Sequence, residues 1–152
     1  MLRPLLKSVI ARHRTTLRDQ DVILDCAPDL AVWAGAEDLD RAVSNLIDNA
    51  AEHGSPPITV TAHQVGPGEP AVLIEVRDHG PGFDPGFLPR AFGRFTRADS
   101  ARTCGGTGLG LAIVAALARR HGGRVTVSNH LGGGATVALT LLVAPAPIPA
   151  AR

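Results

Sequence analysis

Four glycines stand close together just before a long apolar segment. They are Gly105, Gly106, Gly108 and Gly110, and the apolar segment runs on to His121. Glycine raises the entropic cost of ordering a chain, so a cluster at a helix start indicates close approach of the backbone to another group. A helix N-terminus offers unpaired N–H groups and the positive end of a dipole, which suit a phosphate. Taken alone, these glycines fit a phosphate site and a flexible loop before a core helix equally well.

The spacing of these glycines matches neither common nucleotide motif. A P-loop requires lysine after its last glycine, and Leu111 follows Gly110 here. A dinucleotide fingerprint requires G-x-G-x-x-G after a strand, whereas Gly106, Gly108 and Gly110 alternate after a polar loop.

Asn45 and Asn49 lie four residues apart in a predicted helix, so they share one of its faces. Asparagine is a mediocre helix former, and two stacked amides beside an apolar stripe suggest ligation of a hard cation through carbonyl oxygen. A solvated polar edge is the alternative.

Asp78 ends an alternating strand and leads into Gly80-Pro81-Gly82. Its carboxylate could accept a hydrogen bond from an exocyclic amine, with the glycines leaving room for a flat ring. An ordinary turn aspartate is the alternative.

The segment RAFGRFTRADSART combines Phe92 and Phe95 with several arginines. A basic, irregular segment just before a phosphate-receptive helix suggests a lid that adds positive charge to a polyphosphate. An irregular loop anchored by its aromatic residues is the alternative.

The elements that would position these residues follow from periodicity and breakers. We predict helices over residues 2–17, 37–53 and 109–121, and strands over 21–29, 58–65, 71–78, 124–129 and 135–143, with a further short extended piece at 31–35. Because most strands come as hairpins, the order favours a two-layer α/β sandwich with a mixed, mostly antiparallel sheet and helices on one face.

Composition places limits on the function. The chain has 152 residues, 45% hydrophobic content and a net charge of +1, which gives no electrostatic case for binding nucleic acid or an anionic membrane. No apolar run is long enough to span a membrane, and Cys26 and Cys104 lack metal-site spacing. We therefore expect a cytoplasmic domain.

Together, the motifs NLIDNAAEH, DHGPG, AFGRFTR and GGTGLGLAIV form an ordered series. The series resembles the ATP-binding catalytic domain of bacterial sensor histidine kinases, in the gyrase, heat-shock, histidine-kinase and mismatch-repair ATPase superfamily. The resemblance runs from about Leu2 to Val143. It implies a Bergerat-type ATP-binding fold over residues 1–144, followed by a Pro/Ala-rich tail, 145–152, that we expect to be disordered.

The resemblance also implies roles for individual residues toward ATP and Mg²⁺. It makes Asn49 the magnesium ligand, Asn45 its neighbour near the phosphates, Asp78 the acceptor for the adenine amino group, and Arg97 a phosphate-binding residue of the lid. Asn45, Asn49 and Arg97 are the implied catalytic residues. The remaining implied nucleotide-binding residues are His53, Gly80, Gly82, Phe92, Gly106, Thr107, Gly108, Leu109 and Gly110.

Glu52 departs from the family pattern, which commonly has Lys or Arg three residues after the second asparagine. A carboxylate there adds like charge near a triphosphate unless it faces solvent or pairs with Arg41 or His53. We expect weaker nucleotide binding than in a lysine-bearing relative.

No histidine of the chain has the sequence context of a phosphoacceptor. His13 comes nearest, but it lacks an acidic neighbour, and we expect an exposed helix residue there. The resemblance therefore implies an acceptor histidine on a separate dimerisation domain or chain, with a response regulator further along. Without that domain we expect a monomer.

Three other functions fit the same superfamily. An anti-sigma-factor serine kinase and a gyrase-type hydrolase would each carry Glu where Asn45 stands, so both fit less well. A non-catalytic ATP-binding switch module remains conceivable because of Glu52.

Overall fold

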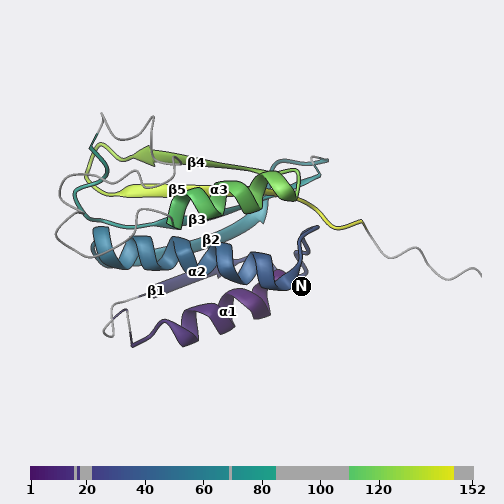
Figure 1. The fold of residues 1–152 in the computed structure, drawn as a ribbon, viewed down its shortest axis with the longest axis horizontal. Coiled ribbons are helices and arrows are strands. Elements are labelled where there is room, and N and C mark those ends of the chain that lie inside the picture. The colour runs from purple at the N-terminus through teal and green to yellow at the C-terminus, as the bar shows by residue number, and fades with distance from the viewer. Residues whose placement is uncertain (16, 18–21, 69, 85–109, 146–152) are drawn as a thin grey trace, which may run out of the picture.

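The fold is built from three helices and five strands among the residues that the structure describes (Figure 1). The structure is a computed structural model, and it describes residues 1–15, 17, 22–68, 70–84 and 110–145. In chain order the elements are α1 (Leu2–Arg12), β1 (Val22–Cys26), α2 (Ala36–His53), β2 (Ile58–Gln64), β3 (Ala71–Arg77), α3 (Gly110–Arg120), β4 (Arg124–Asn129) and β5 (Ala135–Leu142).

The strands form one mixed sheet in the order β1-β2-β3-β5-β4. β1 is parallel to β2, and the other three pairings are antiparallel. The predicted mixed, mostly antiparallel sheet is therefore confirmed. β5 lies between β3 and β4, so the segment that contains α3 connects two strands that are not neighbours.

The three helices cover one face of the sheet (Figure 1). Alternate residues of the strands point toward them, including Val60 on β2 and Ile74 on β3, and both are fully buried. Leu6 of α1 and Leu46 of α2 are buried in the same cluster. The period of two in the strands and the apolar stripes of the helices meet in one core, as the predicted two-layer α/β sandwich requires.

Three of the predicted elements are wrong in extent, and one is the first strand, which ends at Cys26 rather than residue 29. The first helix ends at Arg12 rather than residue 17, and His13 caps it with φ −89° and ψ 0°. The extended piece at 31–35 is reduced to one antiparallel bridge between Val32 and Val143. The sequence of a five-residue piece does not show whether it pairs along its whole length or at one residue only. It therefore did not distinguish this single bridge from a strand.

Residues 146–152 of the predicted tail and the whole predicted lid segment, 90–103, lie outside the described residues. In the part that is described, none of the helices has the length and apolar character that crossing a membrane requires. Cys26 at the end of β1 is buried, and this burial raises the pKa of its thiol.

Candidate functional site

Asp78 is a buried carboxylate at the end of β3. It is only 7% exposed, and its backbone N–H donates to the carbonyl of Ala135 on β5 over 3.0 Å. Its Oδ1 accepts a hydrogen bond of 2.8 Å from the N–H of Gly80. Within the described ranges its Oδ2 has no hydrogen-bond partner. An acceptor with unused capacity therefore lies in a nearly closed environment, where an unpaired polar group is costly.

Three glycines surround Asp78 so closely that side chains in their places would collide with neighbouring atoms. A Cβ on Gly54 would overlap the Asp78 side chain, and one on Gly134 would overlap the Asp78 carbonyl. A Cβ on Gly80 would lie 2.8 Å from the Cα of Gly54. The sequence had named Gly80 and Gly82 as the glycines around Asp78, but it had missed Gly54 and Gly134, whose segments GSPP and LGGGA look like ordinary turns.

The loop after α2 is tied to the loop after β3. The N–H of His79 donates to the carbonyl of Ser55 over 2.9 Å, and His79 Nδ1 lies 2.8 Å from the carbonyl oxygen of Pro57. These contacts join residues more than twenty positions apart and hold the C-terminal end of α2 beside Asp78.

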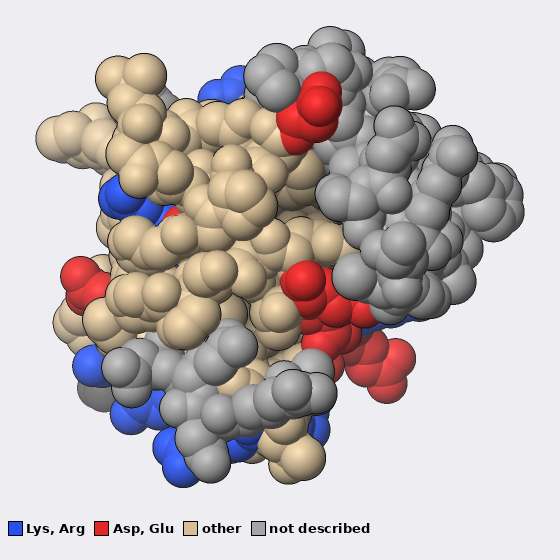
Figure 2. Space-filling view, turned by 90° about the vertical axis from the view of Figure 1, so that its left-hand side faces the viewer, with Lys and Arg blue, Asp and Glu red and all other residues tan. Residues whose placement is uncertain are grey.

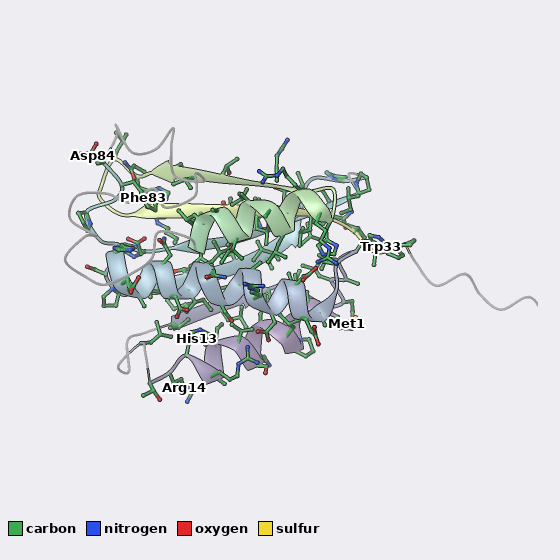
Figure 3. The ribbon with its side chains drawn as sticks, viewed as in Figure 1. Met1, His13, Arg14, Trp33, Phe83 and Asp84 are labelled. Atoms are coloured by element: carbon green, nitrogen blue, oxygen red, sulfur yellow. The ribbon has the colours of Figure 1, made fainter. Side chains whose placement is uncertain are left out.

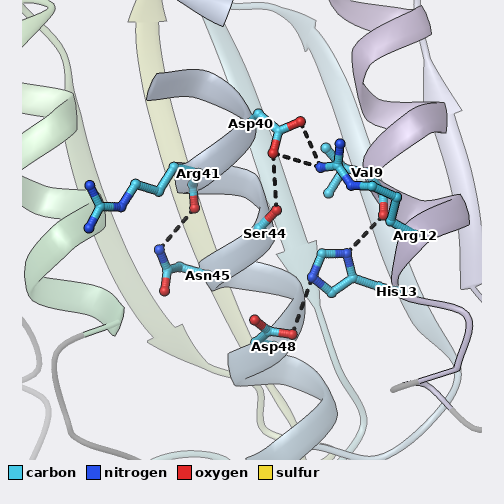
Figure 4. A network of polar contacts seen from close by, with 8 residues as sticks. All are labelled: Val9, Arg12, His13, Asp40, Arg41, Ser44, Asn45 and Asp48. Carbon is cyan, nitrogen blue, oxygen red and sulfur yellow. Dashed lines mark hydrogen bonds and ion pairs between the residues drawn. The ribbon is translucent and has the colours of Figure 1, made fainter. Parts of the chain in front are cut away.

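Asn45 lies on the side of α2 that faces α3. Its Nδ2 donates to the carbonyl of Arg41 over 2.9 Å, as Figure 4 shows. This bond orients the amide and leaves Oδ1 toward α3, where a Cβ on Gly110 would lie 3.4 Å from it. The fold thus brings the first asparagine and the last glycine of the Gly-rich segment together.

Asn49, one turn further along α2, is half-buried. Among the described residues no group of three His, Cys, Asp or Glu side chains could hold a metal ion. A magnesium site here would therefore use an amide oxygen of the chain together with phosphate and water oxygens, which is compatible with the preference of Mg²⁺ for oxygen ligands and retained waters.

Glu52 and His53 end α2 as a pair. Glu52 Oε2 lies 3.5 Å from His53 Nε2, and the Glu52 side chain is 46% exposed. Of the two partners considered for Glu52, the contact is therefore with His53.

Six of the predicted site residues lie outside the described part of the chain. They are Phe92, Arg97, Gly106, Thr107, Gly108 and Leu109. Gly82 is described and has a φ of 78°, in the left-handed region that favours glycine.

His13 is not the exposed helix residue that the sequence predicted. Its side chain is only 14% exposed, with Nδ1 2.8 Å from the carbonyl oxygen of Val9 and Nε2 3.3 Å from Asp48 Oδ1 (Figure 4). Beside it, Arg12 binds both carboxylate oxygens of Asp40 at 2.6 and 2.7 Å. Arg12, the last residue of α1, and His13, which follows it, therefore attach α1 to α2.

The end of the molecule that carries Asp78 has acidic side chains on its surface. Figure 2 looks onto this end and shows acidic groups in red next to the residues that are not described. Asp78 and the half-exposed Glu52 are two of the carboxylates at this end of α2 and β3.

Comparisons with known proteins agree with this geometry. Residues 34–145 match the family model of the histidine kinase-, DNA gyrase B-, and HSP90-like ATPases. In Mycobacterium tuberculosis, the sensor histidine kinase component HK1 is 48% identical over 148 residues, which is 97% of this chain and 83% of that protein. A probable sensor histidine kinase HK of the same species is also 48% identical over 97% of this chain, but this chain spans only 37% of its length.

Solved structures of sensor kinases have the same fold. The mycobacterial sensor histidine kinase MprB superimposes with a TM-score of 0.84 and 32% identity, covering 95% of this chain and 97% of that one. Full-length ShkA in complex with AMPPNP superimposes with a TM-score of 0.80 and 28% identity, covering 98% of this chain and 31% of that one.

The family match covers most of the chain, and α1 and β1, which precede it, are included in the matches to the relatives. The chain therefore belongs to the histidine kinase-, DNA gyrase B- and HSP90-like ATPases, and among them to the ATP-binding catalytic domains of sensor histidine kinases.

Proposed function

We propose that this domain binds Mg²⁺-ATP between α2, the loop after β3 and the start of α3, and presents the γ-phosphate to a histidine of a separate acceptor domain. The observation that carries the proposal is the buried Asp78 carboxylate, which keeps an unused acceptor oxygen inside a wall of glycines. The AMPPNP complex of the structurally similar ShkA supports a nucleotide as the ligand class.

Adenine recognition is assigned to Asp78 and the residues around it. The exocyclic amine of adenine donates to the carboxylate, which uses the acceptor capacity that Gly80 leaves free. The absence of side chains at Gly54 and Gly80 lets the loops after α2 and β3 pack closely around this carboxylate.

The phosphates are assigned to the region between Asn45 and Gly110. Asn49 supplies an amide oxygen to the cation, and Asn45 presents Oδ1 to the same region because its Nδ2 is held by Arg41. Mg²⁺ neutralises phosphate charge when bound. The predicted phosphate contact of Arg97 would add positive charge to the same region.

The start of α3 provides the other side of the phosphate region. Gly110 is its first residue, so unpaired N–H groups and the positive end of the helix dipole lie near Asn45. The predicted contacts of Gly106, Thr107, Gly108 and Leu109 with the phosphates belong to the same proposal. Phosphoryl transfer requires mainly positioning and charge stabilisation, and these residues provide both.

The acceptor is assigned to another domain or chain, working in the cytoplasm and passing the phosphoryl group to a response regulator. Within the described part of the chain, His13 is occupied between Val9 and Asp48 and is poorly placed as an acceptor. Two relatives are equally similar to this chain, and one is little longer than it while the other is much longer. Such a domain therefore occurs both in a short protein and as part of a long one.

The adenine assignment is tested with Asp78→Asn, and Asp25→Asn serves as the matched control on the exposed side of β1. Calorimetric titration should show that Asp78→Asn weakens ATP binding by about 1–3 kcal/mol, roughly 5- to 160-fold in Kd, since a buried hydrogen bond is lost. Asp25→Asn should bind as the wild type does. Unchanged ATP affinity in Asp78→Asn would show that adenine is not read by this carboxylate.

The kinase assignment is tested by mixing the protein with radiolabelled ATP and the helical-hairpin domain encoded next to it. Acid-labile, base-stable label on that partner is the expected result. Label on serine would instead support a serine kinase, and tight ATP binding without transfer would support a non-catalytic switch module.

A further inference from the structure

The side chain of Asn129 binds the backbone of Phe83 with two hydrogen bonds. The N–H of Phe83 donates to Asn129 Oδ1 over 2.8 Å, and Asn129 Nδ2 donates to the carbonyl of Phe83 over 2.7 Å. Asn129 is the last residue of β4, and Phe83 lies at the same end of the sheet as the tip of that strand (Figure 3). The two residues are 46 positions apart in the sequence.

These two hydrogen bonds are of the kind that a paired neighbouring strand would make to Phe83. The side-chain carboxamide of asparagine is planar and carries both an acceptor and a donor, as a peptide group does. It can therefore bind both the N–H and the C=O of one residue. Two bonds to a single residue fix its orientation as well as its position. Phe83 is thereby held in place five residues after Asp78, where regular pairing of β3 has already ended.

Gly82 is fitted to this contact. A Cβ on Gly82 would lie 2.8 Å from Asn129 Oδ1, which is closer than real Cβ atoms approach oxygen. Gly82 also has φ 78°, a conformation that other residues rarely adopt. The close approach of Asn129 therefore requires glycine at this position.

The turn that carries Asn129 also contacts Asp78. His130 and Gly134 close the turn with a backbone hydrogen bond of 3.0 Å, and His130 Nε2 lies 2.5 Å from Thr136 Oγ1. Gly134 packs directly on the carbonyl of Asp78. One turn between β4 and β5 therefore holds both ends of the segment 78–83.

We infer that Asn129 is a positioning residue for the nucleotide: it holds residues 80–83 in the conformation that shapes the space beside Asp78. The inference rests on the proposed function, because it takes Asp78 as the adenine acceptor. Asn129 itself need not touch the nucleotide. Asn129 orders the loop before the nucleotide binds, and this lowers the entropic cost of binding.

The experiment compares Asn129→Ala with Ser128→Ala, which changes the adjacent exposed residue of β4. Affinities for Mg²⁺-ATP and Mg²⁺-GTP are measured by calorimetry, together with amide hydrogen exchange at Phe83 and the melting temperature. Asn129→Ala should weaken ATP binding about tenfold, as expected for the loss of two exposed hydrogen bonds, and should speed exchange at Phe83. GTP binding, which does not use the Asp78 acceptor in the same way, should change little, so the preference for ATP falls.

A purely structural role would lower the melting temperature and leave the ATP-to-GTP preference equal to that of Ser128→Ala; that result would overturn the inference. Asn129→Asp, which keeps the acceptor and loses the donor, provides a second variant and should also lose ATP preference. Asp78→Asn is measured in parallel. If the wild type binds ATP no better than GTP, or if Asp78→Asn binds ATP normally, the adenine assignment itself fails, and this failure is distinct from a normal Asn129→Ala.

Discussion

At the scale of single residues, the candidate site depends on one carboxylate that has few hydrogen-bond partners and has glycines as neighbours. Asp78 is nearly closed off from solvent, yet its side chain receives only one hydrogen bond among the described residues, from Gly80. Gly54 and Gly134 pack directly against Asp78 because they have no side chains. A ligand donor would complete the hydrogen bonding of Asp78, and the proposed adenine amino group would be such a donor.

Gly54→Ala tests this close packing directly. The new Cβ would overlap the side chain of Asp78, and we expect a loss of about 1–3 kcal/mol in the free energy of unfolding, as for overpacking in a filled interior, together with weaker ATP binding. Gly54 has φ −102°, so backbone strain does not contribute. Gly132→Ala, with nothing within 4 Å of its Cβ, is the matched control and should leave both measurements unchanged. Equal urea unfolding curves for the two variants would contradict this prediction.

Glu52→Lys tests the departure from the family pattern. The substitution replaces a half-exposed carboxylate beside His53 with a cation at the end of α2 that carries Asn49. We expect tighter ATP binding, by a few-fold at low ionic strength and less at high salt, because an exposed charge is screened. Titrations at two salt concentrations check this, and an ATP affinity that does not change would show that position 52 points away from the phosphates.

At the scale of elements, α2 packs on the sheet with one part of its surface and presents Asn45 to α3 with another. Its apolar stripe, which includes Leu46 and Ile47, is buried against the sheet, and Asn45 looks toward the start of α3. Two contacts near the N-terminal end of α2 attach it to its neighbours. Asp40 binds Arg12 of α1, and Asp38 binds Arg120 and His121 at the end of α3.

The link from α2 to α3 should depend on pH. The hydrogen bond of 2.8 Å from His121 holds the pKa of Asp38 below its usual value of 3.8, and Arg120 at 3.2 Å acts in the same direction. Because the pKa is lower in the folded state, the carboxylate contributes stability above about pH 3.8, and this contribution is lost as pH falls through the lower, folded-state pKa.

Asp38→Asn should therefore destabilise the protein at pH 7, and the difference from wild type should shrink as the pH falls below about 3.8. Urea unfolding across this pH range checks it. Glu37→Gln, in the same first turn of α2, controls for the loss of a charge near the helix dipole. A destabilisation that stays constant down to the lowest pH would show that ionisation of Asp38 is not its cause.

At the scale of the whole molecule, the candidate site lies at one end of the sandwich, where α2 ends, α3 begins and β3 ends (Figure 1). A ligand that joins these three elements should stabilise the whole fold, because it binds the folded state and not the unfolded chain.

Mg²⁺-ATP should therefore raise the melting temperature. At a free concentration about one hundred times its Kd, the stabilisation is about 2.7 kcal/mol, which corresponds to roughly 5–10 °C for a domain of this size. Chelation of Mg²⁺ should remove much of the shift in the wild type and much less in Asn49→Ala, while Ser128→Ala should behave as the wild type does. An equal effect of chelation in all three proteins would show that Asn49 does not hold the cation.

The chemical residues and most elements could be predicted from the sequence because their signals are local. Asn45 and Asn49 share a helix face by their spacing, and alternation in AVLIEVR and ATVALTLL marks strands of one half-buried sheet. The end of α1 was missed because the hydrophobic pattern continues to Leu17, whereas the contacts of His13 with Val9 and Asp48 close the helix earlier.

The local pattern determined which segments become helices and strands and which residues can do chemistry, since side-chain periodicity and backbone preference act over a few positions. Tertiary structure alone decided the insertion of β5 between β3 and β4, the packing of Gly54 and Gly134 on Asp78, and the binding of Asn129 to Phe83. The side-chain and glycine contacts join residues 24 to 56 positions apart, and the pairing of β3 with β5 joins residues 59 to 71 positions apart. No short-range signal marks them, because each depends on which strands become neighbours once the apolar faces are buried together.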